Sequence, residues 1–111
     1  MSYSVYPTPY FKRLLKRLAK KHPSLKDDLR GLVKVLREQP DSGIHLGHGI
    51  HKVRMAIASK GQGKSGGARV ITYLVTENSE VYLVYIYEKS QLDNITKEQI
   101  MTLVKKAGLI E

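Results

Sequence analysis

Residues 52–87 constrain the fold of this chain more strongly than any other stretch. Three runs within it have the β-branched and aromatic composition of strands: residues 52–59, 68–76 and 80–87. The second connection, at residues 77–79, is short enough for a tight hairpin, whereas the first, at residues 60–67, is a basic loop rich in glycine. We therefore expect these runs to form an antiparallel meander of three strands.

Charge is distributed unevenly along the chain. No acidic residue lies between Asp41 and Glu77, and the same interval carries five lysines and arginines: Lys52, Arg54, Lys60, Lys64 and Arg69. The 111 residues together have a net charge of +9, which favours nucleic acid, an anionic membrane or an acidic protein as partner. This concentration of cations on one small sheet indicates a surface that binds a polyanion.

Composition excludes several classes of protein. The chain has no cysteine, so it has neither disulfides nor a thiolate metal site. It contains no apolar run of membrane-spanning length and no apolar signal-peptide core at its N-terminus. We expect a cytoplasmic protein without a membrane partner, folded as a single domain over residues 1–111.

Amphipathic helices are predicted both before and after the strand region in the sequence. Thr8 is expected to cap a first helix that ends before Pro23, and Ser24 to cap a second. After the strands, Thr96 and Gln99 have the spacing of a capping box and begin a third helix. The first two helices are close enough in sequence to form a helical hairpin.

The predicted fold class is α+β. An N-terminal helical hairpin packs on the small antiparallel sheet, residues 3–6 can add a short edge strand, and a C-terminal helix follows. Residues 43–51 are rich in glycine and are expected to form a loop or an irregular approach to the sheet. All helices are expected on one face of the sheet, which leaves the other face partly open and basic.

Alternation along the strands assigns side chains to the two faces of the sheet. In the first run Val53 and Met55 point one way, whereas Lys52 and Arg54 point the other. In the last run the same rule groups four residues on one face: Val81, Leu83, Tyr85 and Tyr87. The last of these lies at the strand end beside Lys89, which makes it the best tyrosine candidate for a site residue.

The basic loop has more than one interpretation. Residues 58–65 match a permissive phosphate-loop pattern, but no helix follows, and that mechanism needs a helix N-terminus to hold the phosphates. The loop is therefore either a flexible connection or a mobile basic flap. We favour the flap, with Lys60 and Lys64 in contact with an RNA backbone, because glycines allow close approach to a phosphate.

Two further features have both a structural and a functional interpretation. The polar face of the first helix carries six cations, including Lys12 and Lys16, and is either simply solvated or in contact with RNA or the ribosome. His45, His48 and His51 recur every three residues, but the glycines between them argue against a rigid metal site. We expect no bound metal, and a histidine general base is a further alternative.

Several segments of the sequence resemble motifs of the RelE/ParE toxin superfamily, most closely those of its RelE/HigB-type branch. The resemblance rests on Lys52-Val-Arg54, on the loop KGQGKSGGAR at residues 60–69 and on the run VYLVYIYEKS at residues 81–90. It implies the toxin of a bacterial type II toxin–antitoxin pair, with a fold similar to microbial ribonucleases and a cognate antitoxin as partner. Many such toxins cleave messenger RNA in the ribosomal A site, without metal or cofactor, by attack of the ribose 2′-hydroxyl on the adjacent phosphate.

The resemblance also implies roles for individual residues. Lys52 and Arg54 match the family's basic pair, Arg69 matches its basic residue on the next strand, and Lys89 lies near a basic position after the last strand. Both arginines are expected to stabilise the charge on the pentavalent phosphate, and Lys52 to act as base or electrostatic stabiliser. Tyr87 or Lys89 would orient the substrate. Some members have a catalytic tyrosine farther downstream, which this chain lacks, so the base is left open between Tyr87 and a lysine.

Two other functions compete with RNA cleavage. One is inhibition of a protein target such as DNA gyrase, as in the ParE branch, and the other is RNA binding without catalysis. The joint presence of Lys52, Arg54 and Arg69 favours cleavage. A structural alternative for Arg69 is an ion pair with Glu80 or Glu88 on the adjacent strand.

Overall fold

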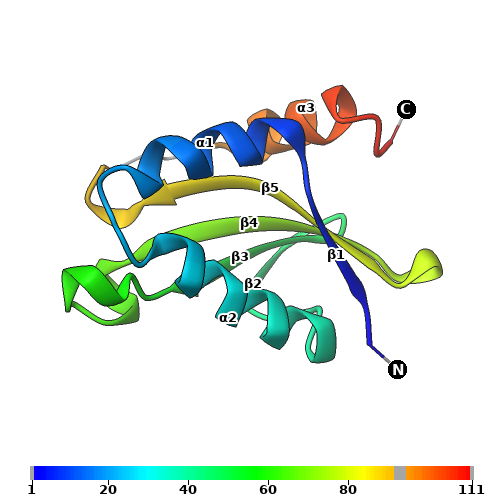
Figure 1. Ribbon diagram of the computed structural model, residues 1–111. Coiled ribbons are helices and arrows are strands. Elements are labelled where there is room, and N and C mark those ends of the chain that lie inside the picture. The colour runs from blue at the N-terminus through cyan, green and yellow to red at the C-terminus, as the bar shows by residue number, and fades with distance from the viewer. Residues whose placement is uncertain (1, 92–94, 111) are drawn as a thin grey trace.

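The computed structural model describes residues 2–91 and 95–110. Over these residues the chain forms a mixed sheet of five strands and three α-helices (Figure 1). The strands are β1 (Ser4–Pro7), β2 (Ile44–Gly47), β3 (Ile50–Met55), β4 (Ala68–Val75) and β5 (Glu80–Glu88). The helices are α1 (Pro9–Ala19), α2 (Leu25–Glu38) and α3 (Lys97–Lys106). Within this described part of the chain, no helix has both the length and the apolar composition needed to cross a membrane.

The sheet is wider than the antiparallel sheet of three strands, with or without an N-terminal edge strand, that the sequence predicts. Its strand order is β1-β5-β4-β3-β2, and β3, β4 and β5 pair antiparallel in chain order. A short N-terminal strand, β1, lies at one edge and pairs in parallel with β5, which makes the sheet mixed. β2 forms the opposite edge and pairs antiparallel with β3.

The prediction of a loop at residues 43–51 is wrong. Those residues form β2 and the start of β3, joined by a tight turn. Three successive turn residues have positive φ, 97° at Gly47, 51° at His48 and 78° at Gly49. The glycines that argue against regular structure are therefore the residues that this turn requires. β3 also ends at Met55, earlier than the predicted run, because Ala58–Lys60 forms a 3₁₀ turn.

Two of the three predicted helix caps form. The hydroxyl of Thr8 accepts a hydrogen bond from the amide of Phe11 at 3.3 Å, and Thr96 and Gln99 form a complete capping box. Ser24 makes no capping bond with α2. Its hydroxyl instead donates to Asp28 at 2.8 Å and accepts from the amide of Ser59 at 2.9 Å, so it ties the start of α2 to the turn that leads into the basic loop.

Helices cover both faces of the sheet, so the prediction that all lie on one face is wrong. Figure 1 shows α1 running along β5 and α2 in front of β2 and β3. The core under these two helices includes Phe11, Leu25, Leu36, Val53, Val70 and Leu83. A second core joins α3 to the opposite face through Ile50, Ile71, Val84, Ile100 and Val104. β4 and β5 are apolar on both faces, and α3 keeps the second apolar surface from water.

A bulge in β5 changes which tyrosines face α3. Val84 is an extra residue in the strand, because Ile71 pairs with Tyr85 whereas the next residue of β4 pairs with Leu83. Leu83 packs in the core under α1 and α2, whereas Tyr85 and Tyr87 pack against the core under α3. The single face predicted for these residues by alternation is therefore wrong, and the bulge turns Tyr87 to the α3 face.

Candidate active site

Arg54, Arg69 and Tyr87 form a row across three neighbouring strands. Arg54 of β3 pairs with Arg69 of β4, which in turn pairs with Tyr87 of β5. Directly paired residues of a sheet point to the same face, with Cβ atoms about 4.5–5.5 Å apart. Lys52 lies two residues before Arg54 and therefore faces the same side. The predicted site residues of the sheet thus lie side by side.

A groove of about 1130 Å³ opens beside this row. Its lining includes six of the predicted site residues: Lys52, Arg54, Lys64, Arg69, Tyr87 and Lys89. The opposite wall is α2, which contributes Gly31 and Val35 and the carboxylates of Asp27 and Asp28. Over the described residues β2 pairs with β3 only as far as Lys52, so the edge of β3 beyond that residue lies in the groove.

Arg69 is the most enclosed cation of the groove. Its side chain is largely buried, with 7% of the residue exposed, and its guanidinium makes hydrogen bonds to three main-chain carbonyls. Nη1 donates to the carbonyls of Lys64 at 3.0 Å and Ala68 at 3.1 Å, and Nη2 donates to the carbonyl of Ser65 at 3.4 Å. These neutral acceptors occupy three of the five N–H donors without neutralising the charge, so the site stays cationic.

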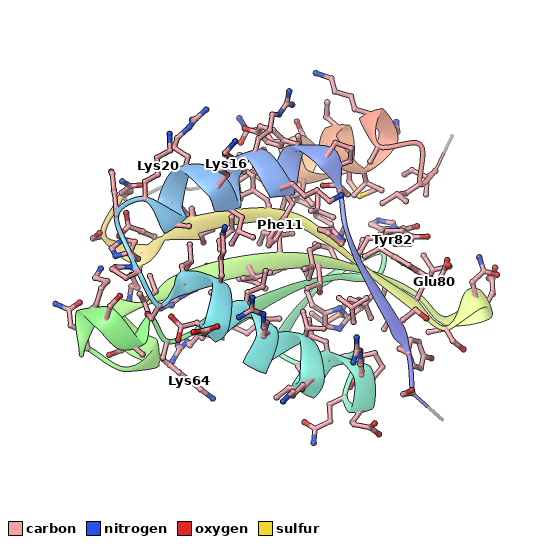
Figure 2. All side chains as sticks on the ribbon, in the orientation of Figure 1. Phe11, Lys16, Lys20, Lys64, Glu80 and Tyr82 are labelled. Atoms are coloured by element: carbon pink, nitrogen blue, oxygen red, sulfur yellow. The ribbon has the colours of Figure 1, made fainter. Side chains whose placement is uncertain are left out.

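The ion pair considered for Arg69 does not form, because both acids have other partners. Glu80 accepts a hydrogen bond of 2.8 Å from the hydroxyl of Tyr82, and this bond, together with burial, raises the pKa of Tyr82 (both labelled in Figure 2). Glu88 binds His22 and Lys60 instead. Among the described residues, no carboxylate lies within ion-pair distance of Arg69.

The basic loop is fixed to its surroundings at several points. The turn at Ala58–Lys60 that leads into the loop is held by α2, because Asp28 accepts a hydrogen bond of 3.1 Å from the amide of Ala58. The last residue of the loop, Gly67, lies so close to β3 that a Cβ atom would approach the carbonyl oxygen of Met55 to 2.1 Å. The Gly67 carbonyl accepts a hydrogen bond of 3.0 Å from the amide of Lys89. A strand, not a helix, follows the loop, so the geometry of a phosphate loop is absent from this segment.

The four predicted RNA-binding lysines have different surroundings. Lys64 is exposed and points away from the molecule in Figure 2, on the side opposite to Lys16. Lys12 and Lys16 are exposed on α1, outside the groove. Lys60 turns inward, where its ammonium lies 3.6 Å from Glu88 and only 19% of its side chain is exposed. The structure therefore brings Lys64 to the groove and holds the other three elsewhere.

The histidines of residues 45–51 lie apart from the groove. The rings of His45 and His51 stack with centroids 4.8 Å apart, and both line a separate hollow with His48 and Asp41. Within residues 2–91 and 95–110, no group of three or more histidines and acids has the arrangement to hold a metal ion. The position of these histidines gives no support to the alternative of a histidine general base.

Sequence reasoning missed two features, one wall of the groove and a buried acid next to the residues that line it. The sequence gives only a weak signal for the α2 wall, the apolar side chain of Val35. In the fold, 46% of this residue is exposed. Glu88 gives a clearer signal, because it is an acid placed between Tyr87 and Lys89 at the end of a strand. Only the fold shows that Glu88 is buried, with 5% of the residue exposed, and that it contacts the turn before α2 and the basic loop.

Comparison with known proteins gives two results. The sequence model of a family described as the RelE toxin of the RelE/RelB toxin–antitoxin system matches residues 7–111. Among solved structures, a mutant of E. coli toxin RelE in the free state, with two arginines replaced by alanine, superposes with a TM-score of 0.64. The match covers 96% of this chain and 98% of the other at 14% sequence identity, so it shows a shared fold.

Proposed function

The chain belongs to the RelE toxin family, and from this membership we propose that it is an endoribonuclease that cleaves messenger RNA on the ribosome and thereby inhibits translation. As the toxin of a toxin–antitoxin system it has a cognate antitoxin as partner. In this proposal it acts in the bacterial cytoplasm, where that antitoxin neutralises it. The reaction is attack of a ribose 2′-hydroxyl on the adjacent phosphate, with no metal and no cofactor.

The row of Arg54, Arg69 and Tyr87 is the observation that carries this proposal. A pentavalent phosphate has one more negative charge than the phosphodiester from which it forms. Two guanidinium groups on one face can stabilise that charge, because their planar forks match phosphate oxygens. Loss of one such donor at a developing anion typically costs about 3–4 kcal/mol, or roughly a hundredfold to a thousandfold in rate.

The reaction needs one group to accept a proton and another to donate one. A bond forms between the 2′-oxygen and phosphorus, and the bond from phosphorus to the 5′-oxygen of the next nucleotide breaks. In our proposal Lys52 or Tyr87 accepts the proton of the 2′-hydroxyl, or Lys52 acts only through its charge. Lys89, two residues after Tyr87 in the chain, orients the substrate and donates a proton to the leaving 5′-oxygen. All of these residues line the same groove.

RNA beyond the reacting phosphate is bound by further cations. Lys64 extends the positive surface from the row to the tip of the basic loop. Lys12 and Lys16 lie four residues apart on α1, so they follow one another along the helix at about 6 Å. Both lie outside the groove lining, and Lys16 lies on the side of the molecule opposite to Lys64 (Figure 2), so they suit a different part of the ribosome's RNA. The sequence predicts an RNA contact for Lys60 as well, although its ammonium already has an acidic partner.

The test combines a cellular and a purified system. Transcript ends are mapped before and after induced expression, and new ends inside translated codons support the proposal. Single-turnover cleavage of ribosome-bound messenger RNA is then measured with and without EDTA, after the effect of EDTA on the ribosome has been controlled. Intact transcripts together with gyrase-poisoned DNA would instead identify a ParE-like inhibitor. Cleavage that requires a divalent metal at the chemical step would contradict the proposed mechanism.

A further inference from the structure

His22, Glu88 and Lys60 form a largely buried ionic cluster next to the basic loop. None of the three lines the groove. We propose that this cluster of His22, Glu88 and Lys60 is a positioning device that holds the basic loop and, through the loop, the guanidinium of Arg69. The inference rests on the proposed function for its catalytic consequence. Its structural part, the anchoring of the loop, stands independently of what the groove cleaves.

Three separate segments meet at the carboxylate of Glu88. Its Oε1 lies 2.6 Å from Nε2 of His22, in the turn between α1 and α2, and 3.6 Å from the ammonium of Lys60. The side chains of His22 and Glu88 are only 13% and 7% exposed. A carboxylate is rarely buried unless it is paired and hydrogen-bonded, because its desolvation is costly. The carboxylate therefore holds both partners to the end of β5.

The cluster is linked to the active site through the loop itself. Lys60 lies at the start of the loop, and the carbonyls of Lys64 and Ser65 in its middle accept the hydrogen bonds of Arg69. The neighbours of Glu88 in β5 and just after it, Tyr87 and Lys89, line the groove directly. Release of Lys60 removes one of the contacts that hold the loop, so the carbonyls that fix Arg69 are held less rigidly.

The contrast between the two loop lysines supports this role for Lys60. Lys64 is exposed at the groove and forms no ion pair among the described residues, whereas the ammonium of Lys60 is enclosed and faces a carboxylate. An ammonium that already has an acidic partner releases few counterions when RNA binds. Lys60 is therefore assigned a positioning role in place of the RNA contact that the sequence suggests.

Hydrogen exchange in the absence of RNA tests the anchoring alone. Lys60→Met keeps the length of the side chain and removes its charge, and Lys64→Met is the matched control in the same loop. We expect amide exchange of residues 61–67 to rise about tenfold in Lys60→Met and to change by less than about twofold in Lys64→Met. Unchanged exchange in Lys60→Met would overturn the proposal, and this comparison is decisive even if the protein cleaves no RNA.

Kinetics and binding then separate positioning from RNA contact. For Lys60→Met we expect single-turnover cleavage of saturating RNA to fall about tenfold, with the Kd for RNA and its salt dependence unchanged. For Lys64→Met we expect weaker binding and a salt slope reduced by about 0.7. If Lys60→Met loses salt slope as Lys64→Met does, Lys60 is an RNA contact and the proposal is wrong.

Variants of Glu88 provide a second line of test that does not depend on Lys60 alone. Glu88→Asp keeps the charge and should retain more cleavage than Glu88→Gln, and thermal melting identifies any variant that fails to fold. Because both residues act through one contact, Glu88→Gln combined with Lys60→Met should cost no more than Glu88→Gln alone. Additive losses in the double variant would show that the two residues act separately. A wild-type protein that cleaves no RNA would refute the proposed function, not the anchoring.

Discussion

Arg54 and Arg69 stand directly opposite each other on β3 and β4. Like charges at directly opposed positions destabilise a sheet, so this pairing carries a cost in the free protein. Neither arginine has a carboxylate within ion-pair distance among the described residues. A phosphate bound over the pair would interact favourably with both arginines. The destabilising pair is therefore expected where a phosphate binds.

Replacement of Arg54 should therefore separate activity from stability. Arg54 is exposed, and Arg54→Gln removes one member of the repelling pair, so we expect the free energy of unfolding to rise by about 0.2–0.5 kcal/mol. Cleavage should fall roughly a hundredfold to a thousandfold. Urea unfolding and single-turnover cleavage measure the two quantities, with Arg37→Gln on α2 as a control of equal charge outside the groove. Cleavage close to that of the control would exclude contact with the phosphate.

Arg69 should behave differently, because it also supports the main chain. Arg69→Lys keeps the charge but cannot reproduce the three hydrogen bonds to the carbonyls of Lys64, Ser65 and Ala68. We expect the free energy of unfolding to fall by about 1–3 kcal/mol, since buried acceptors are left without partners. Cleavage should also fall, and more steeply than the loss of folded protein explains. A variant with wild-type cleavage would show that the fork geometry of the guanidinium is not needed.

Local patterns in the sequence are sufficient to predict where much of the candidate site lies in the sheet. Alternation in β3 places Lys52 and Arg54 on the face opposite to Val53 and Met55, and the burial of these residues agrees with it. The caps at Thr8 and Thr96 also follow from local chemistry. These features depend on residues within a few positions of one another, which is why a single sequence is enough to identify them.

Features that depend on distant residues could not be predicted. The bulge at Val84 arises from the pairing of β5 with β4, and without it Tyr87 would face away from Arg69. α3 covers the second apolar face of the sheet. Any helix of the chain with an apolar side could cover that face, so the sequence alone does not show which helix does. The enclosure of Lys60 depends on an acid that is distant in sequence.

Glycine substitutions test the close approach of the basic loop to β3. In Gly67→Ala the new Cβ would lie 2.1 Å from the carbonyl oxygen of Met55, so the main chain must move. We expect a loss of about 1–3 kcal/mol in the free energy of unfolding. Gly31→Ala is the matched control, because no atom lies within 4 Å of the added Cβ and the residue is in the middle of α2. It should stabilise the protein by about 0.5–1 kcal/mol. Equal effects of the two substitutions in urea unfolding would contradict the packing of Gly67.

RNA binding should depend strongly on salt. The groove presents Lys52, Arg54, Lys64 and Lys89 in addition to the enclosed Arg69. Each phosphate contact contributes about −0.7 to the slope of log K against log salt for single strands, so four contacts give roughly −3. Fluorescence anisotropy with a short RNA from low to high salt measures the slope. Lys34→Met, on α2 outside the groove lining, is the control for the charge change in Lys64→Met. A slope near zero would remove the argument for a polyanion in the groove.

The two basic surfaces should contribute to different contacts with the translation machinery. Lys16 and Lys64 point to opposite sides of the molecule, so one short RNA strand cannot reach both surfaces readily. The double variant Lys12→Met with Lys16→Met should therefore bind ribosomes about tenfold more weakly and bind a short single-stranded RNA with nearly unchanged affinity. Lys64→Met should weaken both. Co-sedimentation with ribosomes and anisotropy with the short RNA give the two affinities at one salt concentration. The control for the α1 variant is Lys105→Met with Lys106→Met, at the end of α3, which has the same loss of charge. If both double variants weaken ribosome binding equally, the effect reflects net charge, and α1 carries no specific contact.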